Sequence, residues 1–465
     1  MKLFYKIKNG KLLPILTSFA SIKLCNDQIE ASNQKQQKEV PGSPTGLNIA
    51  NNLRNVTKQI KNYLVFKKEE YSIKGFSFAV CVGNGSPGVI NFGTMDVNTN
   101  KEVHSLTKFN LGDLSMLHTA SMFLYENIVK REETGSLMDK DIRSTLLPTF
   151  EDGKRPWIDE IFEYKKVDYR DLLMHNGKFI HVLQKDKDFL GTTDSSCVPV
   201  SASPYTHFKD YLKDTLIIHI KNLFRIDKIL QDRNEESIVN EKYDEIKDEI
   251  AGLEDNQYLF SKHNYNVLLY LLALECGQSS SPDSMFMAYF DQMEMYDSDV
   301  AGLPKIRPHR SRHYELSERS NDMEAHVLQP ARYQDPAILL GAHGLLATAR
   351  DMACFGSKLI SFFNTDGSKE KEYSTFLFEH CYRFLPRKCS SVDDNRQLND
   401  IKKDGILLTS NTLGASNIFF VRPADDEIGQ LSFSFLSNSG SISHKHLREI
   451  AHFIVEKYTD DINDQ

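Results

Sequence analysis

The sequence predicts an α+β fold in which both ends of the chain contribute strands to one antiparallel sheet, with a helical lobe inserted between them. Two observations favour this arrangement. Near the N-terminus a helical pattern is followed by a β-hairpin, and near the C-terminus two strands are followed by a helix. The middle of the chain is largely helical, so the sheet has to draw its strands from the two ends.

Length and composition limit the classes of protein to consider. The chain has 465 residues, of which 40% are apolar, so it can bury a large core and global disorder is excluded. Its length fits two or three domains, or one large domain with insertions. With 56 basic and 64 acidic residues the net charge is −8, which argues against a nucleic-acid partner. No apolar stretch reaches the roughly 18 residues that a transmembrane helix needs.

Changes in the apolar period define the N-terminal elements. Residues 48–67 carry apolar side chains at three-to-four spacing, which predicts a helix. Residues 76–82 alternate, and after the turn at 83–88 the apolar pattern resumes at Val89, which predicts a hairpin. A further helix should begin at Asp113, because an aspartate directly after a glycine is a favourable N-cap and a buried pattern follows.

The middle and the C-terminal part supply the lobe and the remaining strands. Residues 210–253 are strongly charged and predict a solvated helical insertion. The elements expected after it are a helix at 267–274, a helix at 345–360 with Thr348 and Asp351 near its start, strands at 417–421 and 431–436, and a closing helix at 446–458. We expect one domain at 48–458, with the lobe and insertion within about 113–345, between a targeting or linker segment (1–47) and a tail (459–465).

The first 26 residues favour import across a membrane. They contain five lysines and no acidic residue, as in mitochondrial presequences, although such presequences usually favour arginine and none is present. A secretory signal with residues 12–22 as a short apolar core is the alternative, and a lysine-rich terminus without a targeting role is the third interpretation. We expect a mitochondrial protein, with secretion as the alternative.

Neither cysteines nor histidines have the spacing of a metal site. The seven cysteines include no C-x-x-C pair and their number is odd, so we expect reduced, mostly buried thiols instead of zinc ligands or a disulfide framework. His309 and His313 are four residues apart, but no glutamate or third ligand stands in a recognisable position beside them. We therefore expect no metal and no cofactor.

Several segments occur in the order in which they occur in a known family. They are 107–112 (TKFNLG), 170–175 (RDLLMH), 344–356 (GLLATARDMACFG) and 414–416 (GAS) followed by Pro423. These segments resemble motifs of the serine β-lactamase and penicillin-binding-protein-like hydrolases, over roughly residues 50–458. Residues 306–314 (IRPHRSRHY) and the charged insertion resemble the animal mitochondrial serine β-lactamase-like proteins. The resemblance implies a β-lactamase/transpeptidase-like fold.

Acyl transfer in this family needs groups that this sequence lacks at the matching positions. The chemistry uses a serine nucleophile, a lysine one helical turn later, a tyrosine that relays protons, and a strand that offers backbone donors to the oxyanion. By resemblance the corresponding residues here are, in that order, Asp113, Met116, Phe260-Ser261-Lys262 and Leu408-Thr409-Ser410. We therefore expect no catalytic residue and interpret these eight positions as a relic cleft.

Other serines are weaker candidates for a nucleophile. Ser115 lies about 200° round the helix from Asp113 and should face away from the cleft. Ser105 and Ser368 each precede a lysine by three residues, but the first lies before a strand and the second in a polar loop. Ser261 has only the adjacent lysine as a base.

Three of the replacements carry structural expectations. Asp113 is either a helix cap that accepts amide donors or an anionic group in the relic pocket. Lys262 either pairs with Asp113, which would move the positive charge of the family's lysine instead of deleting it, or points to solvent. Met116 should pack as core.

The function expected from the sequence is that of a catalytically degenerate hydrolase with a structural or regulatory role. The resemblance implies a mitochondrial protein, self-assembly into a homo-oligomer or filament, and a link to lipid metabolism. Two alternatives remain: an active serine-type hydrolase, peptidase or esterase with a rearranged site, and a module that binds a small-molecule ligand of unknown identity in the relic cleft.

Overall fold

The computed structural model of the chain describes residues 44–83, 85–130, 136–146, 167–176, 262–277, 282–301, 309–317, 327–331, 340–386, 402–412, 414–424, 429–440 and 442–463. The chain divides into two compact units, residues 1–58 and residues 59–465. Helix α2 (Pro44–Glu70) begins in the first unit and ends in the second. The sheet, the helical lobe and the candidate site all belong to the second unit.

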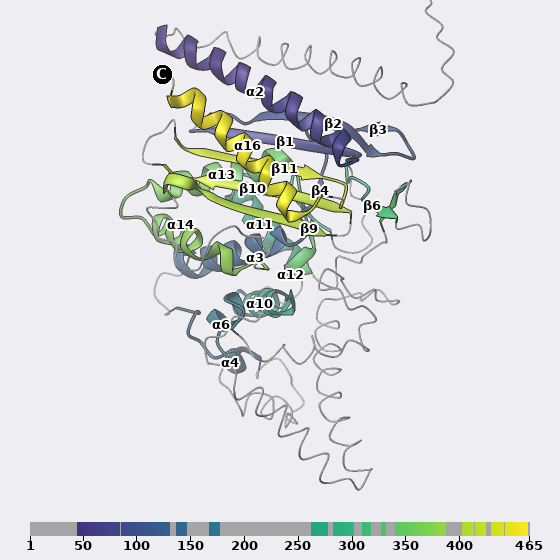
Figure 1. The fold of residues 1–465 in the computed structure, drawn as a ribbon. Helices are drawn as coiled ribbons and strands as arrows, with labels where there is room; N and C mark the ends of the chain where they lie inside the picture. Colours follow the sequence, from purple (N-terminus) through teal and green to yellow (C-terminus); the bar gives the residue numbers. More distant parts are fainter. Residues whose placement is uncertain are drawn as a thin grey trace, which may run out of the picture. The chain divides into compact units, whose positions relative to one another are not determined.

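Strands from both ends of the chain form one antiparallel sheet, as predicted. Within the described residues this sheet has six strands in the order β3-β2-β1-β11-β10-β9. Strand β1 pairs with β11, with Val80 opposite Phe433, so the first strand lies beside the last (Figure 1). The strands are β1 (Gly75–Val82), β2 (Gly88–Asp96), β3 (Lys101–Glu102), β9 (Ile406–Thr412), β10 (Ala415–Arg422) and β11 (Leu431–Ser437).

Alternating side chains of β11 divide the sheet into two packed faces. Ser432 and Ser434 donate hydrogen bonds of 3.1 and 2.7 Å to backbone carbonyls of helix α13 (Ala349–Phe363). The intervening Phe433 points to the other face and stacks on Phe420 of β10. Helix α16 (His444–Asn463) covers that second face (Figure 1). Both faces are therefore buried by helices; β11 presents serines to α13 and aromatic rings to the opposite face.

The helical lobe lies between the two groups of strands along the chain. Its long helix α3 (Leu114–Leu124) continues as a π-helical turn, η1 (Tyr125–Lys130). The other helices of the described chain are α4 (Ile142–Leu146), α6 (Tyr169–Leu173), α10 (Lys262–Glu275), α11 (Pro282–Gln292), α12 (Leu340–His343), α14 (Lys369–His380) and the 3₁₀ turn η4 (Cys381–Arg383).

Two small sheets complete the described structure. Strand β8 (Leu345–Ala347) pairs antiparallel with β4 (Phe109–Asn110) and β5 (Asp299–Val300), and β6 (Tyr314–Ser317) pairs with β7 (Val327–Pro330). Because β4 directly precedes helix α3, its pairing with β8 brings the start of that helix close to the segment that follows α12.

Most predicted elements are confirmed, with one wrong boundary. The structure contains the helix predicted at 48–67 (α2), the hairpin (β1 and β2) and the apolar helix predicted at 267–274 (within α10). It also contains the two late strands (β10 and β11) and the closing helix (α16). The helix predicted at 345–360 begins only at Ala349, because residues 345–347 form strand β8 and Thr348 caps the helix by accepting the amide of Asp351. The predicted insertion at 210–253 lies outside the described residues. No helix of the described chain is long and apolar enough to cross a membrane.

A chain of polar side chains is buried where α3, α11, α13 and α14 meet. The ring nitrogens of His118 lie 3.3 Å from the Tyr289 hydroxyl and 3.1 Å from the Met352 sulfur. Tyr289 donates a 2.7 Å hydrogen bond to Ser121, which also contacts the hydroxyl of Tyr373. Burial lowers the pKa of His118 to about 3, so this imidazole is neutral at physiological pH.

We predict that His118 makes the fold sensitive to acid. The unfolded chain protonates this histidine below its ordinary pKa of about 6.5. Its stabilising contribution is therefore complete above about pH 6.5 and is lost as the pH falls toward about 3. When the pH falls from about 7.5 to about 5.5, the free energy of unfolding of His118→Gln, measured with urea, should decrease by about 1 kcal/mol less than that of the parent protein.

The matched control is His452→Gln, at an exposed histidine of α16. This variant should lose as much stability in acid as the parent. If His118→Gln also loses as much as the parent, the buried imidazole does not set the acid sensitivity.

Candidate functional site

The turn before α3 places the backbone of Asp113 next to strand β9. Gly112 has φ +56°, and a Cβ at this position would lie 2.6 Å from the hydroxyl oxygen of Ser410, so glycine is required there. Asn417 fixes the preceding backbone by donating a 2.9 Å hydrogen bond to the carbonyl oxygen of Asn110. Asp113 therefore enters α3 at a position that is completely buried.

Asp113 occupies the N-cap position of α3 but does not cap the helix. Its side chain accepts no hydrogen bond from the first helical amides, and its backbone is already helical at φ −57° and ψ −25°. A capping side chain normally needs an extended backbone to reach back to those amides. The interpretation of Asp113 as a helix cap is therefore wrong.

The carboxylate of Asp113 instead meets two nitrogen atoms from distant parts of the chain. The ammonium nitrogen of Lys262, the first residue of α10, lies 3.3 Å from Asp113 Oδ1. The Nε2 atom of His343, the last residue of α12, lies 2.7 Å from the same oxygen. The predicted pairing of Lys262 with Asp113 is confirmed, and its solvent-facing alternative is wrong because Lys262 is buried. We call these three residues the charge cluster.

Helix α12 is held tightly between α3 and α10, and this position fixes His343. Thr119 on α3 donates a 2.6 Å hydrogen bond to the carbonyl of Gly341, and Asn266 on α10 accepts the amide of Gly341 at 2.9 Å. A Cβ at Gly341 would lie only 2.4 Å from the carbonyl oxygen of Tyr265. A side chain at this position would push α12 outward and move the imidazole away from Asp113.

The protonation states of the charge cluster follow from burial and mutual charge. Burial alone would raise the pKa of Asp113, but Lys262 and His343 hold this pKa well below its usual range. Burial, together with the nearby charge of Lys262, lowers the pKa of His343. At neutral pH the cluster therefore contains a carboxylate, an ammonium and a neutral imidazole. Because a carboxylate only accepts hydrogen bonds, Nε2 of His343 carries the ring hydrogen.

The backbone amide of Asp113 is also occupied. It donates a 3.0 Å hydrogen bond to the side-chain hydroxyl of Ser410 on β9. This backbone donor is therefore satisfied within the protein.

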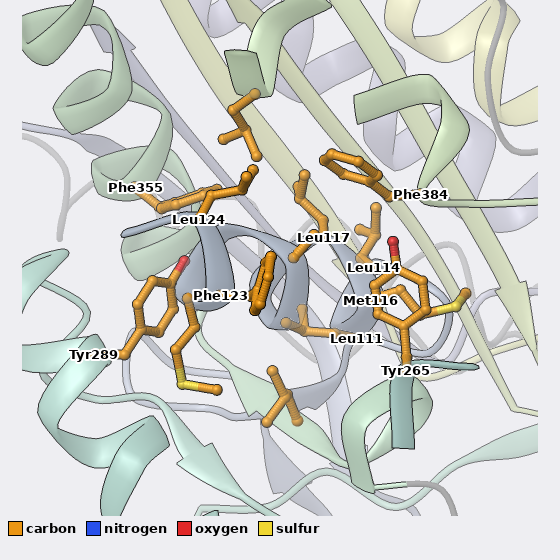
Figure 2. Close-up of a cluster of buried hydrophobic side chains, with 14 of the residues drawn as sticks. Leu111, Leu114, Met116, Leu117, Phe123, Leu124, Tyr265, Tyr289, Phe355 and Phe384 are labelled. Carbon is orange, nitrogen blue, oxygen red and sulfur yellow. The ribbon is translucent and has the colours of Figure 1, made fainter. Parts of the chain in front are cut away.

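The side chains of the other relic-cleft positions of the described chain are not members of the charge cluster. Met116 and Leu408 are completely buried in the apolar core, where Figure 2 shows Met116 in one cluster with Leu114, Leu117 and Tyr265. Thr409 points to the opposite face of the sheet and lies 2.8 Å from Nδ1 of His444. Phe260 and Ser261 lie outside the described residues.

Ser115 is buried and has a structural contact. Its hydroxyl accepts a 3.3 Å hydrogen bond from the amide of Leu345, which links α3 to strand β8. Ser115 therefore helps to place the segment that follows His343 along the chain.

No group of three metal-ligating side chains occurs in the part of the chain that the structure describes. Nδ1 of His309 lies 3.2 Å from Nε2 of His104, so these two histidines contact each other.

We predict that Lys262 is essential for stability because it neutralises a buried carboxylate. Lys262→Met should lower the free energy of unfolding by about 3–5 kcal/mol, since a buried charge left without its partner is costly. Adding Asp113→Asn to this variant should recover most of the loss, because the unpaired carboxylate is then removed. Urea unfolding of the single and double variants measures both effects.

The control is Lys358→Met, which removes a more exposed lysine whose nitrogen lies 2.6 Å from Glu294. This change should cost no more than about 1 kcal/mol. If Lys262→Met is as mild as Lys358→Met, the charge cluster does not stabilise the fold.

The known proteins that resemble this chain are solved structures; no protein-family model and no curated protein matches it. FmtA from Staphylococcus aureus superposes with a TM-score of 0.53 at 13% identity, over 87% of this chain and 90% of FmtA. The D-alanine carboxypeptidase AmpC from Burkholderia cenocepacia gives 0.52 at 13% identity, over 87% of this chain and 99% of the other. A D-amino acid amidase from Ochrobactrum anthropi gives 0.53 at 14% identity, over 88% and 99%.

Class C β-lactamase and penicillin-binding-protein structures match to a similar degree. At 12–14% identity these similarities concern the fold alone. They confirm the predicted α+β class, with an antiparallel sheet from both ends of the chain and an inserted helical lobe. The protein therefore has the β-lactamase/transpeptidase-like fold.

Proposed function

We propose that this protein is a catalytically degenerate member of the β-lactamase-like fold, in which the acyl-transfer site has become a closed structural element. The observation that carries this proposal is the state of Asp113. Its carboxylate is paired with Lys262 and its amide with Ser410, so both groups at the nucleophile position are occupied by the protein itself.

Nucleophilic attack would need a group that the charge cluster does not offer. Asp113 is ionised, but the ion pair with Lys262 and the hydrogen bond from His343 stabilise its carboxylate and reduce its nucleophilicity. One turn later, where the resembling hydrolases have a lysine that takes the proton of the nucleophile, the thioether of Met116 cannot accept a proton at neutral pH.

The loss of the oxyanion site supports the same conclusion. An oxyanion would have to displace the Ser410 hydroxyl from the amide of Asp113, and it would then lie beside a carboxylate of like charge. Removal of a nucleophile or base from hydrolases of the serine type lowers turnover by about 10⁶, and the rate that remains depends on the oxyanion site. Here that remaining contribution is also blocked.

A non-catalytic protein that retains a large folded domain is suited to a structural or regulatory role. The lysine-rich, acid-free N-terminus supports a mitochondrial location for this role. The resemblance to the animal mitochondrial serine β-lactamase-like proteins supports self-assembly into a homo-oligomer or filament and a link to lipid metabolism, as an analogy of fold.

We predict that the protein does not hydrolyse substrates of this fold. The purified full-length chain, incubated with a chromogenic cephalosporin or a p-nitrophenyl ester, should give the same rate as its Asp113→Asn variant. Asp113→Ser should also be inactive, because the amide of residue 113 remains bound to the Ser410 hydroxyl and is not available to an oxyanion.

A serine-directed acylating probe followed by mass spectrometry separates the alternatives. The proposal requires that no residue near Asp113 is labelled. Turnover above the rate of Asp113→Asn, together with a labelled cleft residue, would show an active hydrolase with a rearranged site.

A second prediction concerns the N-terminal segment. Residues 1–47 fused to a fluorescent protein should direct it to mitochondria in a membrane-potential-dependent manner, because a cationic segment without acidic residues is drawn across a negative-inside membrane. Replacing the five lysines within residues 1–26 by glutamine should abolish import. Secretion of the fusion would support the alternative signal-peptide interpretation.

A further inference from the structure

A pair of cysteines lies between strand β1 and helix α13, away from the charge cluster. Cys81 on β1 is buried, and Cys354 on α13 is partly exposed. Both thiols are free. They lie far apart in the sequence and have no motif spacing.

The packing of α13 against the sheet brings the two residues together. Cys81 is the cross-strand neighbour of Ser432, whose hydroxyl donates a 3.1 Å hydrogen bond to the carbonyl of Ala353, the residue before Cys354. A Cβ at Gly356 would lie 2.0 Å from the hydroxyl oxygen of Ser432, so the helix backbone approaches the strand closely at this point. This close approach places Cys354 of α13 next to Cys81 of β1.

The two thiols differ in their exposure to solvent. Cys354 is partly exposed and Cys81 is buried, so a small oxidant reaches Cys354 first. The neighbouring Cys81 thiol lowers the pKa of Cys354, whereas the carboxylates of Asp351 and Glu294 oppose this effect and Arg350, one helical turn earlier, supports it. Cys354 is therefore the accessible thiol, and Cys81 is the buried partner beside it.

We propose that Cys354 and Cys81 form a peroxide-sensitive dithiol, in which Cys354 is the reacting thiol and Cys81 the resolving thiol. The Cys354 thiolate attacks one oxygen of hydrogen peroxide, the O–O bond breaks, and the products are a cysteine sulfenic acid and hydroxide, which takes up a proton to become water. The Cys81 sulfur then attacks the sulfenic sulfur, the thiol proton leaves with the hydroxyl group as a second water, and the S–S bond forms. In total two thiols are oxidised and one peroxide is reduced to two waters.

The disulfide would join the first strand of the sheet covalently to the helix that covers it. This link would restrain α13 on the sheet in oxidising conditions and release it in reducing conditions. The pair thus gives the fold an oxidation site that is independent of the relic cleft, and its existence does not rest on the proposed function.

Peptide mapping of the full-length protein tests the pair directly. After treatment with hydrogen peroxide and alkylation of the remaining thiols, non-reduced tryptic digestion should give a cross-link between peptides 75–101 and 351–358, which contain Cys81 and Cys354. The cross-link should disappear on reduction with dithiothreitol. In Cys81→Ala, where no resolving thiol remains, a dimedone probe should trap the sulfenic acid at Cys354.

Cys276 is the internal control, because it is an exposed cysteine outside the proposed pair. Cys276→Ser should form the cross-link as the parent does, and Cys354→Ser should not form it. If Cys276 is oxidised while no cross-link between Cys81 and Cys354 forms, the proposal is wrong. A disulfide from Cys354 to any other cysteine would overturn it in the same way.

Discussion

The neutralisation of one buried carboxylate holds the core of this protein together. Asp113 is completely buried, and a charge in such a place costs several kcal/mol unless it is paired and hydrogen-bonded. Its partners Lys262 and His343 come from α10 and α12, and Ser410 comes from β9. The charge cluster therefore joins α3 to α10 and α12, and the hydrogen bond from the Asp113 amide to Ser410 joins the start of α3 to the sheet. If α10 or α12 moves away, the carboxylate loses a partner.

Under the proposed function, the same contacts explain how a β-lactamase-like fold can lose acyl-transfer chemistry without losing its structure. A catalytic serine with its lysine needs an open cleft and unoccupied donors, which weaken a core. Here Met116 fills core space where the resembling hydrolases have an ammonium group, Lys262 supplies a positive charge from another helix, and Ser410 satisfies the amide. Each of these replacements removes a group that acyl transfer needs and adds a contact that stabilises the filled site.

Sequence reasoning recovered the fold and part of the site, for identifiable reasons. The elements follow from apolar period and turn residues, which are local, and the pairing of Lys262 with Asp113 follows from aligned motifs. His343 and Ser410 were missed as partners because their contacts depend on the close approach of α12 to α10 and of the Gly112 turn to β9. Asp113 was misread as a cap because the local pattern is that of a cap, whereas tertiary partners take its carboxylate. The contact between Cys81 and Cys354 likewise depends on helix-to-sheet packing that no local pattern reveals.

Hydrogen exchange at the backbone amide of Asp113 tests the central claim most directly. Mass spectrometry with fragmentation that resolves single residues gives the exchange rate of this amide in the parent protein and in Ser410→Gly. If the site is closed by its own side chains, the amide should exchange only on large-scale opening in the parent, and several-fold faster when the serine hydroxyl is removed. Exchange in the parent at the rate of an unprotected loop would show an open, solvent-filled site and would contradict this account.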